Sequence, residues 1–503
     1  MTEVFAEQAT EVGAMKGGAA GDGGALSVLP PLSAAQKITY SMGDLAEAMI
    51  SVSLGQFLLF YLTAVVGMSG ALAGSALALT LVVDAMVDPA VGYISDNSRF
   101  RMGRRHPFML AAAIPMAVAL ALLFSIPKIE STGLLFGYVF GVLLMLRFSY
   151  SVFVLPYIAL GAELTRDYHE RSVLQVYRNF FNIVGNILTV NLGLGLFMAG
   201  KNGLLDHAAY IPFGWTCAGI IIVTTMLCTL GTLSTRHRMY EIAPPEKSAL
   251  ARLPGELRDV FRNHSFMMLL LTIVIFWIAQ GSSINLSVYT YSYFWKVDAG
   301  TIRTILTCGT IGLFCGIPIC AFLLQRMEKK TICTGGIVLV CALLFAPPIL
   351  RIAHILPESG LPLTVIMCGF AFTQSIVLTN VFISFNSMMV DAADEHDLLF
   401  GVRREGLYFS ALSFSGKAAL GVGSLFAGFA LDYLIQFPHD LAAHPNQVIE
   451  NWTLVKLGLI AGPGAAAISA FSAIAMSRYR ISKDRLFEIQ ADLAKRNGTA
   501  ASA

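Results

Sequence analysis

The sequence predicts an all-α integral membrane protein with about twelve transmembrane helices in two six-helix pseudo-repeats. The chain of 503 residues is 56% hydrophobic and 13% charged, with a mean hydropathy of +0.68, whereas soluble globular chains carry about 25% charged residues. Hydrophobic runs of about 20 residues, enough to span a hydrocarbon core of about 30 Å, recur along nearly the whole chain. The longest internal polar stretch, residues 236–263, divides these runs six and six.

The expected spans follow one another in chain order and are separated by polar gaps. Those of the first half are 37–66, 72–95, 108–127, 132–160, 173–199 and 211–235, and those of the second half are 264–293, 301–325, 331–351, 361–390, 404–433 and 452–477. The resulting organisation is a disordered N-terminal tail (1–36), a six-helix bundle (37–235), a cytoplasmic linker (236–263), a second six-helix bundle (264–477) and a cytoplasmic C-terminal tail (478–503). The N-terminal tail is acidic and glycine-rich and lacks the apolar core of a signal peptide.

The charges of the gaps predict the orientation of the chain. Lys and Arg gather in alternate gaps, which include RFRMGRRH, AELTRDYHER, QRMEKK, EHDLLFGVRR and the tail SRYRISKDR. The opposite gaps carry few basic residues, and the 434–451 loop has none. By the positive-inside rule the basic gaps and both termini face the cytoplasm of a cell inner (plasma) membrane.

Composition and motifs argue against several other classes of protein. A net charge of +2 gives no basic field that would attract nucleic acid. The eight cysteines lie in or beside apolar runs without a CxxC pair, which is typical of core residues rather than disulfides or metal ligands. No nucleophile–base pair, metal-spaced cluster or phosphate loop occurs. A membrane enzyme or receptor is therefore a remote alternative, and neither a cofactor nor a structural metal is expected.

Two acidic residues, Asp84 and Asp88, fall within the second span, where a charge costs at least about 2.5–3.5 kcal/mol. Their spacing places both carboxylates on one helix face. Two like charges this close in a low dielectric need a proton, Na⁺ or a basic side chain to neutralise them. We interpret the pair as a cation-coupling site. The alternative is a static ion pair with Arg147, halfway along the fourth span, that only fastens two helices.

Lys417 also lies within a span, about 13 residues into the eleventh, or about 20 Å along a helix. It could neutralise the spare carboxylate across the two halves or reach the substrate, the alternative being snorkelling to an interface. The nine histidines all lie in gaps or at span ends. Any proton carrier inside the membrane must therefore be a carboxylate.

Polar side chains on several spans predict a substrate-binding cavity. Amides and aromatic faces suit the hydroxyls and C–H faces of a sugar, although such residues also form hydrogen bonds between membrane helices. The candidates are Asp44, Glu47, Arg178, Asn179, Asn182, Gln280, Asn285, Tyr289, Gln374 and Lys417.

Charged pairs at the cytoplasmic ends of the spans predict a gate. Asp96 precedes the Gly-Arg-Arg of the first basic gap, and acidic residues are followed by an arginine after both the fourth and the tenth span. This echo between the halves is typical of transporters built from repeats, with substrate bound near the midplane. The predicted gate residues are Asp96, Arg104, Arg105, Glu163, Arg171, Asp391 and Arg403.

Four segments resemble one family, the glycoside–pentoside–hexuronide:cation symporters, which form the melibiose-permease-like branch of the major facilitator superfamily. They are DAMVDPAVGYISDNSRFRMGRRHPF (84–108), YSMGD (40–44), PYIALGAELTRDYHERSVLQVYR (156–178) and VDAADEHDLLFGVRREGLYFSALSFSGK (390–417). The resemblance implies the major facilitator fold, with Asp84 and Asp88 as the coupling carboxylates and Lys417 as the intramembrane lysine of the family. It also implies that Ser151, on the fourth span, can supply an oxygen ligand.

The sequence departs from the family pattern where melibiose permease holds Na⁺ and galactosides. Val87 stands in place of the amide that helps hold Na⁺, and Ala48 and Glu47 stand where an acid and a lysine would be. The acid and the tryptophan of the fourth span are replaced by Val154 and Ile158. Galactoside recognition is therefore not carried over, and the lost ligand favours H⁺ because a proton needs no coordination shell.

Together these observations predict a symporter of a sugar or glycoside that works by alternating access as a monomer in the lipid bilayer. The coupling ion is H⁺ or Na⁺, with H⁺ favoured and Asp84 and Asp88 as the site where Na⁺ would bind. The alternative substrate is an amphiphile such as a lysolipid.

Overall fold

The computed structural model describes residues 30–98, 100–165, 167–200, 203–238, 260–402, 404–444 and 447–500. Over these residues the chain is helical and contains no strand, which confirms the all-α prediction. The expectations for the start of the N-terminal tail, for Arg403 and for residues 239–259 of the linker lie outside the described residues. The described cysteines are all free thiols, and Cys217, Cys228, Cys320 and Cys333 are buried.

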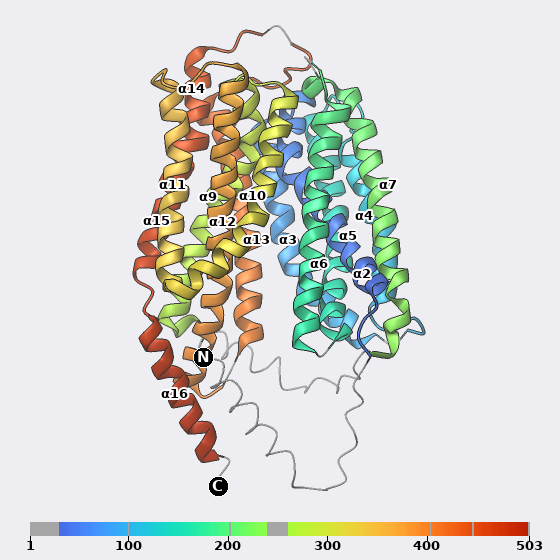
Figure 1. Cartoon of the computed structure of the whole chain (residues 1–503). Helices are drawn as coiled ribbons and strands as arrows, with labels where there is room; N and C mark the ends of the chain where they lie inside the picture. The colour runs from blue at the N-terminus through green and yellow to red at the C-terminus, as the bar shows by residue number, and fades with distance from the viewer. Residues whose placement is uncertain are drawn as a thin grey trace.

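The first half contains six spans (Figure 1). The first span consists of α2 (Ala34–Val52) and the π-helical segments η1 (Ser53–Leu58) and η2 (Tyr61–Val65). The others are α3 (Gly70–Asn97), α4 (His106–Leu123), α5 (Thr132–Leu164), α6 (Tyr168–Val190) with η3 (Asn191–Phe197), and α7 (His207–Gly231). Two short 3₁₀ turns, η4 (Gly203–Leu205) and η5 (Leu233–Arg238), flank α7.

The second half also contains six spans. They are α9 (His264–Tyr289) with η6 (Thr290–Phe294), α10 (Ala299–Arg326), α11 (Lys329–Ile352), α12 (Gly360–Phe400), α13 (Glu405–Phe429) with η7 (Ala430–Ile435), and α14 (Asn451–Leu459) with η8 (Ile460–Gly464) and α15 (Ala465–Ser477). The predicted end of the tenth span at residue 390 was too early, because α12 continues through the acidic segment DAADEHD to Phe400. The predicted C-terminal tail contains a further helix, α16 (Lys483–Ala500), and Arg496 on it pairs with Asp397 on α12.

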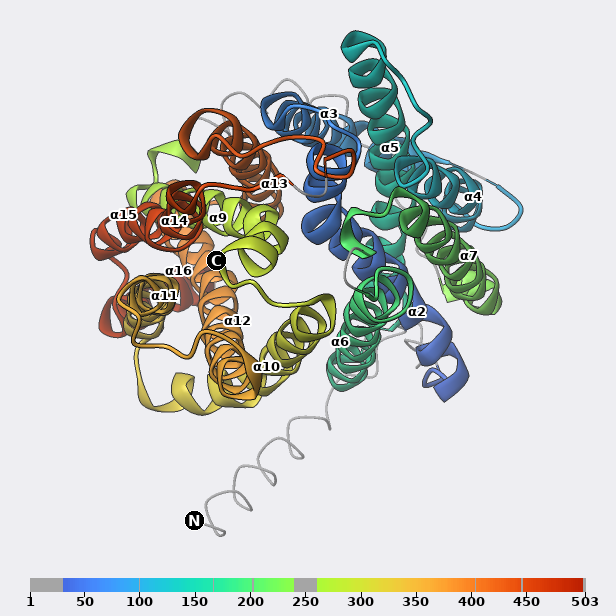
Figure 2. The same cartoon turned by 90° about the horizontal axis from the view of Figure 1, so that it is seen from above.

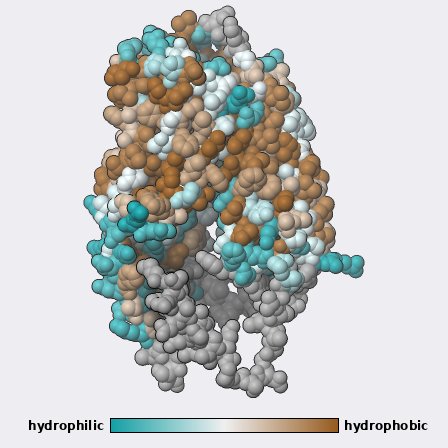
Figure 3. All heavy atoms as spheres, in the orientation of Figure 1, coloured by the Kyte–Doolittle hydropathy of each residue, from teal (hydrophilic) through white to brown (hydrophobic). Residues whose placement is uncertain are grey.

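Eleven helices among the described residues are long and apolar enough to cross a membrane, by length and composition. The first span, which is divided among α2, η1 and η2, adds a twelfth. On the face that Figure 3 displays, hydrophobic side chains cover most of the middle and hydrophilic ones gather toward the lower end. The span number predicted from hydropathy is thus confirmed.

Several helices begin where the sequence supplies a capping side chain. Ser33 accepts a hydrogen bond from the amide of Gln36 at the start of α2, so that the helix begins at Ala34 inside the predicted tail. Asp167 and Asp298 cap α6 and α10 in the same way. Such caps satisfy backbone N–H groups that the first helical turn leaves unpaired.

The two halves lie side by side as separate bundles, as the view from above in Figure 2 shows. They meet where α3 lies against α13 and α6 against α10. We call the end that carries loops 98–105 and 327–328 the basic end, and the end that carries loops 66–69 and 436–450 the opposite end. Figure 3 shows the surface hollowed between the halves toward the basic end.

At the opposite end the halves are joined by hydrogen bonds. The carboxylate of Asp432 accepts the backbone N–H groups of Gly70 and Ala71, each at 2.8 Å, at the N-terminus of α3. The Thr63 hydroxyl contacts the Tyr289 hydroxyl, and the Asp440 amide donates to the Thr63 carbonyl. Because a helix N-terminus favours negative charge, Asp432 stabilises this closed end.

Gly428 lets the backbones of α3 and α13 touch near this end. A Cβ added to Gly428 would lie 2.1 Å from the Gly70 carbonyl oxygen, which is backbone and cannot rotate away. We expect Gly428→Val to separate the two helices and lower the midpoint of thermal unfolding of the purified protein by several degrees, because overpacking costs about 1–3 kcal/mol. Gly219→Val on α7, where a Cβ would meet nothing within 4 Å, serves as the control. Equal midpoints for the two variants would contradict the close approach.

Candidate functional site

The two carboxylates of α3 lie at the junction of the halves, between a lysine and a serine. The ammonium group of Lys417, on α13, donates to Asp84 Oδ2 at 2.8 Å and to Asp88 Oδ2 at 2.5 Å. On the other side the Ser151 hydroxyl oxygen, on α5, lies 2.5 Å from Asp84 Oδ1 and 2.7 Å from Asp88 Oδ1. Four residues from three helices, one of them in the other half, therefore form a single cluster.

This cluster is mostly shielded from solvent. The side chain of Asp84 is fully buried, that of Asp88 is 18% exposed and that of Lys417 is 25% exposed. With both carboxylates ionised, the cluster carries two negative charges and one positive charge. Burial of an uncompensated charge is costly; the charge of Arg147, on α5, also acts on both carboxylates.

The two contacts of Ser151 bear on whether Asp84 or Asp88 carries a proton. A hydroxyl group has one hydrogen to donate, yet its oxygen lies within hydrogen-bonding distance of both carboxylates. If both carboxylates were ionised, the two O···O contacts would have to share the single hydroxyl hydrogen in a three-centre hydrogen bond. A proton on either carboxyl would complete both contacts, because that carboxyl would donate to Ser151 while Ser151 donates to the other.

Arg147, the predicted alternative partner of the two carboxylates, forms no ion pair within the part of the chain that the structure describes. Its Nε is buried without a hydrogen-bond partner there. The cation that contacts Asp84 and Asp88 is Lys417. Of the two partners considered from the sequence, the structure brings only the lysine into contact.

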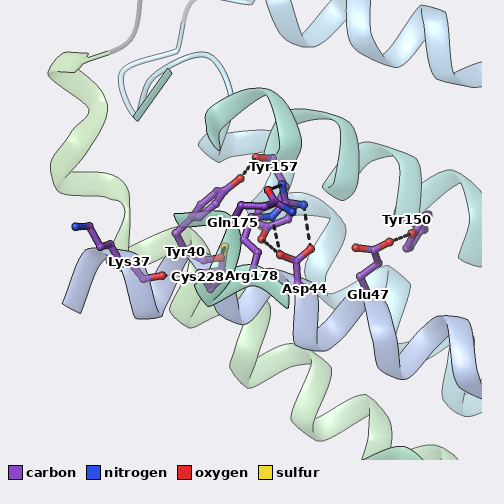
Figure 4. Close-up of polar contacts among 10 residues, drawn as sticks. Lys37, Tyr40, Asp44, Glu47, Tyr150, Tyr157, Gln175, Arg178 and Cys228 are labelled. Carbon is purple, nitrogen blue, oxygen red and sulfur yellow. Dashed lines mark hydrogen bonds and ion pairs between the residues drawn. The ribbon is translucent and has the colours of Figure 1, made fainter. Parts of the chain in front are cut away.

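A second ionic cluster lies within the first half (Figure 4). The guanidinium group of Arg178, on α6, donates to both carboxylate oxygens of Asp44, on α2, at 2.6 and 3.0 Å. Asp44 also accepts the Tyr157 hydroxyl at 2.8 Å, and the Tyr157 ring stacks on Tyr40 with centroids 4.7 Å apart. Two predicted substrate-binding residues therefore neutralise each other in this structure.

Glu47 lies one turn beyond Asp44 on the same helix, and Figure 4 shows it turned toward Tyr150 on α5. The Tyr150 hydroxyl donates to Glu47 Oε1 at 3.2 Å. No ion pair of Glu47 occurs among the described residues. Glu47 therefore differs from Asp44, whose charge is balanced by Arg178.

A cavity of about 480 Å³ lies between the halves. Helices α2, α6, α9, α10, α11 and α12 and the segments η1, η6 and η8 contribute to its lining. Among the predicted substrate residues, Gln280 and Gln374 line it, and Gln280 Nε2 is buried without a hydrogen-bond partner in the described part of the chain. Further polar lining residues are Ser51, Gln56, Asn186, Ser283, Ser287, Thr290 and Ser375.

The remaining predicted amides and the tyrosine contact other parts of the protein or are exposed to solvent. Asn285 donates to the Gly281 carbonyl and to Ser424, and Tyr289 contacts Thr63 across the halves. Asn182 accepts a hydrogen bond from Asn186, and Asn179 is exposed. Their substrate-binding role stays a prediction, because period and polarity could not separate cavity lining from contacts between helices.

An aromatic pair that sequence reasoning missed lies beside the cavity. Trp277 on α9 and Phe382 on α12 stack with ring centroids 4.7 Å apart. Both line the large cavity and also a smaller one of about 280 Å³ that Lys417 borders. The available signal was a tryptophan in the middle of an apolar span, which is too common in membrane helices to be informative alone.

Four of the five predicted gate residues of the first half form one network at the basic end. Arg105 pairs with Asp96 at 3.0 Å and with Glu163 at 2.6 Å, and Arg104 also contacts Glu163. The predicted pairing of Glu163 with Arg171 is not what the structure shows, since Arg171 donates to the backbone carbonyls of Thr165 and Ala162 instead.

In the second half the predicted partner of Asp391, Arg403, lies outside the described residues. Asp391 pairs with Lys329 at 2.7 Å. Lys329 belongs to the basic gap QRMEKK, so its charge was visible in the sequence but its partner was not.

The chain is similar to known membrane transporters over most of its length. The sequence model of the MFS/sugar transport protein family matches residues 39–483. The putative glycoside/cation symporter YagG of Escherichia coli (strain K12) is 26% identical over 92% of this chain and 95% of its own length. The isoprimeverose transporter of Lactiplantibacillus pentosus is 24% identical over 89% of each chain. The uncharacterized symporter sll1374 of Synechocystis is 39% identical, over 31% of this chain and 30% of its own length.

Solved structures with the same fold include two transporters with little sequence identity. A bacterial homologue of the human lysosomal transporter Spinster, in an inward-facing and unoccupied conformation, aligns with a TM-score of 0.62 and 13% identity over 90% of this chain and 97% of its own. The xylose transporter XylE of E. coli, in a partially occluded inward-open conformation, aligns with a TM-score of 0.56 and 12% identity over 90% of this chain and 98% of its own.

Proposed function

This chain belongs to the MFS/sugar transport protein family, and from that premise we propose that it carries a sugar or glycoside across the membrane together with a proton. Its family is one of multi-pass membrane transporters and not of enzymes. A small molecule is therefore its substrate, and a cation its coupling partner. The choice of H⁺ and of a sugar is the proposal.

The proposal rests on the number of hydrogen atoms available for the two contacts that the Ser151 hydroxyl makes with Asp84 and Asp88. The arrangement of Asp84, Asp88, Ser151 and Lys417 satisfies every short contact when one carboxyl holds a proton. The same proton brings the charge of the cluster to zero. Since Lys417 belongs to the second half, binding and release of that proton change the electrostatic contact between the halves.

The oxygen atoms available at the cluster favour a proton over Na⁺ as the coupling ion. Sodium would need several oxygen ligands, and the Oδ2 atoms of both carboxylates already contact Lys417. Val87, between the two acids, offers no side-chain oxygen. A proton needs only one carboxylate oxygen and leaves the lysine in position.

The arrangement of the halves supports alternating access. Hydrogen bonds join them at the opposite end, and the surface is hollowed between them toward the basic end (Figure 3). With the basic end cytoplasmic by the positive-inside rule, this is an inward-facing state of a monomer in the inner (plasma) membrane. The network of Arg105, Asp96 and Glu163 would then belong to the cytoplasmic gate.

A sugar suits the chemistry of the large cavity. Its amides and hydroxyls can bind sugar hydroxyls, and Trp277 and Phe382 offer flat apolar faces for C–H groups. The names of the relatives, a glycoside/cation symporter and an isoprimeverose transporter, support the same class.

The test is uptake into liposomes that contain the purified protein. A gradient of H⁺ or of Na⁺ is imposed separately, with radiolabelled isoprimeverose, a methyl glucuronide, lactose and lysophosphatidylcholine as probes. We expect one of the sugars to accumulate when the outside is acidic, and no accumulation with the Na⁺ gradient alone. Accumulation driven by Na⁺ would overturn the choice of proton, and uptake of the lysolipid alone would overturn the choice of sugar.

A further inference from the structure

We propose that Glu47 is a second proton-binding carboxylate, separate from Asp84 and Asp88, in the interior of the first half. Its part in transport rests on the proposed function, whereas proton binding at Glu47 can be measured without any substrate. In the family pattern described above this position holds a lysine, and here it holds Glu47. The proposed site therefore belongs to this chain and is not carried over from the family.

The contacts of Glu47 leave its charge unbalanced. The Tyr150 hydroxyl, a neutral donor, lies 3.2 Å from Oε1. Among the described residues no Lys, Arg or His nitrogen comes within 4 Å of the Glu47 carboxylate. The side chain is only partly accessible to solvent, so water does not replace the missing cation fully.

The charged and titratable groups on neighbouring helices do not supply that cation. On its own helix Glu47 has Asp44 one turn away, another acid, and the Arg178 guanidinium of α6 is bound to Asp44 through both carboxylate oxygens. On α7 the nearby titratable group is Cys228, whose thiol donates to the Tyr40 carbonyl. Repulsion from Asp44 acts on Glu47 and exceeds the opposing attraction of the Arg178 charge, and a proton removes it.

On α5 Tyr150 faces Glu47, and Arg147, one turn earlier, acts electrostatically on Tyr150 and on Asp84 and Asp88. Arg147 is the one cation nearby whose side chain has a buried nitrogen without a hydrogen-bond partner in the described part of the chain. A shift of Arg147 toward Glu47 would neutralise the ionised carboxylate. Glu47 therefore has two means of neutralisation, a proton in the state seen here and Arg147 in a state where the helices are rearranged.

The position of Glu47 connects it to both functional regions. Tyr150 immediately precedes Ser151, so adjacent residues of α5 contact Glu47 and the Asp84–Asp88 pair. Ser51, one turn beyond Glu47 on α2, lines the large cavity. Loss of the Glu47 proton would place a negative charge on a residue whose neighbours reach both regions, which gives its uptake and release a route to the transport cycle.

Infrared absorption of the carboxyl C=O group, recorded while the pH of the purified protein is varied, tests the inference. We expect wild-type protein to show a carboxyl that is still protonated at about pH 6, where an exposed glutamate has lost its proton, and Glu47→Gln to lose that signal. Glu358→Gln, at an exposed loop position, is the matched control and should leave it unchanged. An identical signal in wild type and Glu47→Gln would overturn the proposal.

Three further variants keep the test decisive. Glu47→Asp retains a carboxyl and should shift the band rather than remove it, which guards against a folding defect in Glu47→Gln. Arg147→Gln removes the alternative cation and should extend the protonated form to higher pH; an unchanged titration would overturn the role given to Arg147. Asp88→Asn should retain the Glu47 signal, so loss of the coupling carboxylate and loss of the Glu47 site give different results.

Discussion

Replacing Asp88 by asparagine is expected to abolish uphill accumulation of substrate while leaving exchange of substrate partly intact. In the variant, Lys417 neutralises the remaining Asp84 by itself, so the cluster no longer needs a cation. The driving force of one charge is about 2.3 kcal/mol per 100 mV, which corresponds to about 50-fold accumulation. The ratio of inside to outside substrate in energised vesicles should therefore fall from tens to about one.

A carboxylate far from the membrane interior provides the matched control for this substitution. Asp492 lies on α16 and its side chain is 52% exposed, so Asp492→Asn should accumulate substrate as the wild type does. Exchange of internal for external labelled substrate, measured in the same vesicles, shows that Asp88→Asn still folds and binds. Accumulation by Asp88→Asn at the wild-type level would refute the assignment of the coupling cluster.

Replacing Lys417 by methionine is expected to reduce stability more than any single change in the coupling cluster. Asp84 is fully buried and Lys417 is the cation within reach of both acids. Removal of one partner from a buried ion pair costs about 3–5 kcal/mol, somewhat reduced here because Lys417 is a quarter exposed. We expect a lower midpoint of thermal unfolding for Lys417→Met, together with loss of transport.

A second substitution separates the loss of charge balance from the loss of packing. The double variant Lys417→Met with Asp88→Asn leaves one carboxyl, which a single proton can neutralise, so its unfolding midpoint should return most of the way to that of the wild type. Transport coupling should not return. Lys495→Met, at a side chain 79% exposed, is the control. A Lys417→Met variant as stable as the control would favour the snorkelling alternative for this lysine.

Local properties of the sequence predicted the helices and placed the two acids of the second span on one helix face. A hydrophobic run long enough to span the membrane is a continuous stretch of the chain, so the number of spans followed from hydropathy. Spacing of four residues placed Asp84 and Asp88 on one face without any knowledge of the neighbours. The same local reasoning ended the tenth span too early, because packing keeps an acidic segment helical as far as Phe400.

The sequence could not show which charged side chains form ion pairs with one another. Arg147 and Lys417 were both candidates for the two acids, and the structure selects the lysine, 333 positions from Asp84. Glu163 was expected to pair with Arg171, eight positions away, yet it contacts Arg104 and Arg105, which are almost sixty positions earlier. An ion pair forms between side chains that the packing of helices brings together, and distance along the chain does not report that packing.

The sequence by itself determined that this is a twelve-span membrane protein with two acids inside the second span, since both follow from the cost of placing polar groups in hydrocarbon. The tertiary structure alone decided that Asp44 is neutralised by Arg178 and that Glu47 is not. It also decided that Ser151 and Lys417 enclose Asp84 and Asp88 from two sides. Burial can be predicted from residues one at a time, whereas charge compensation depends on which helix faces meet.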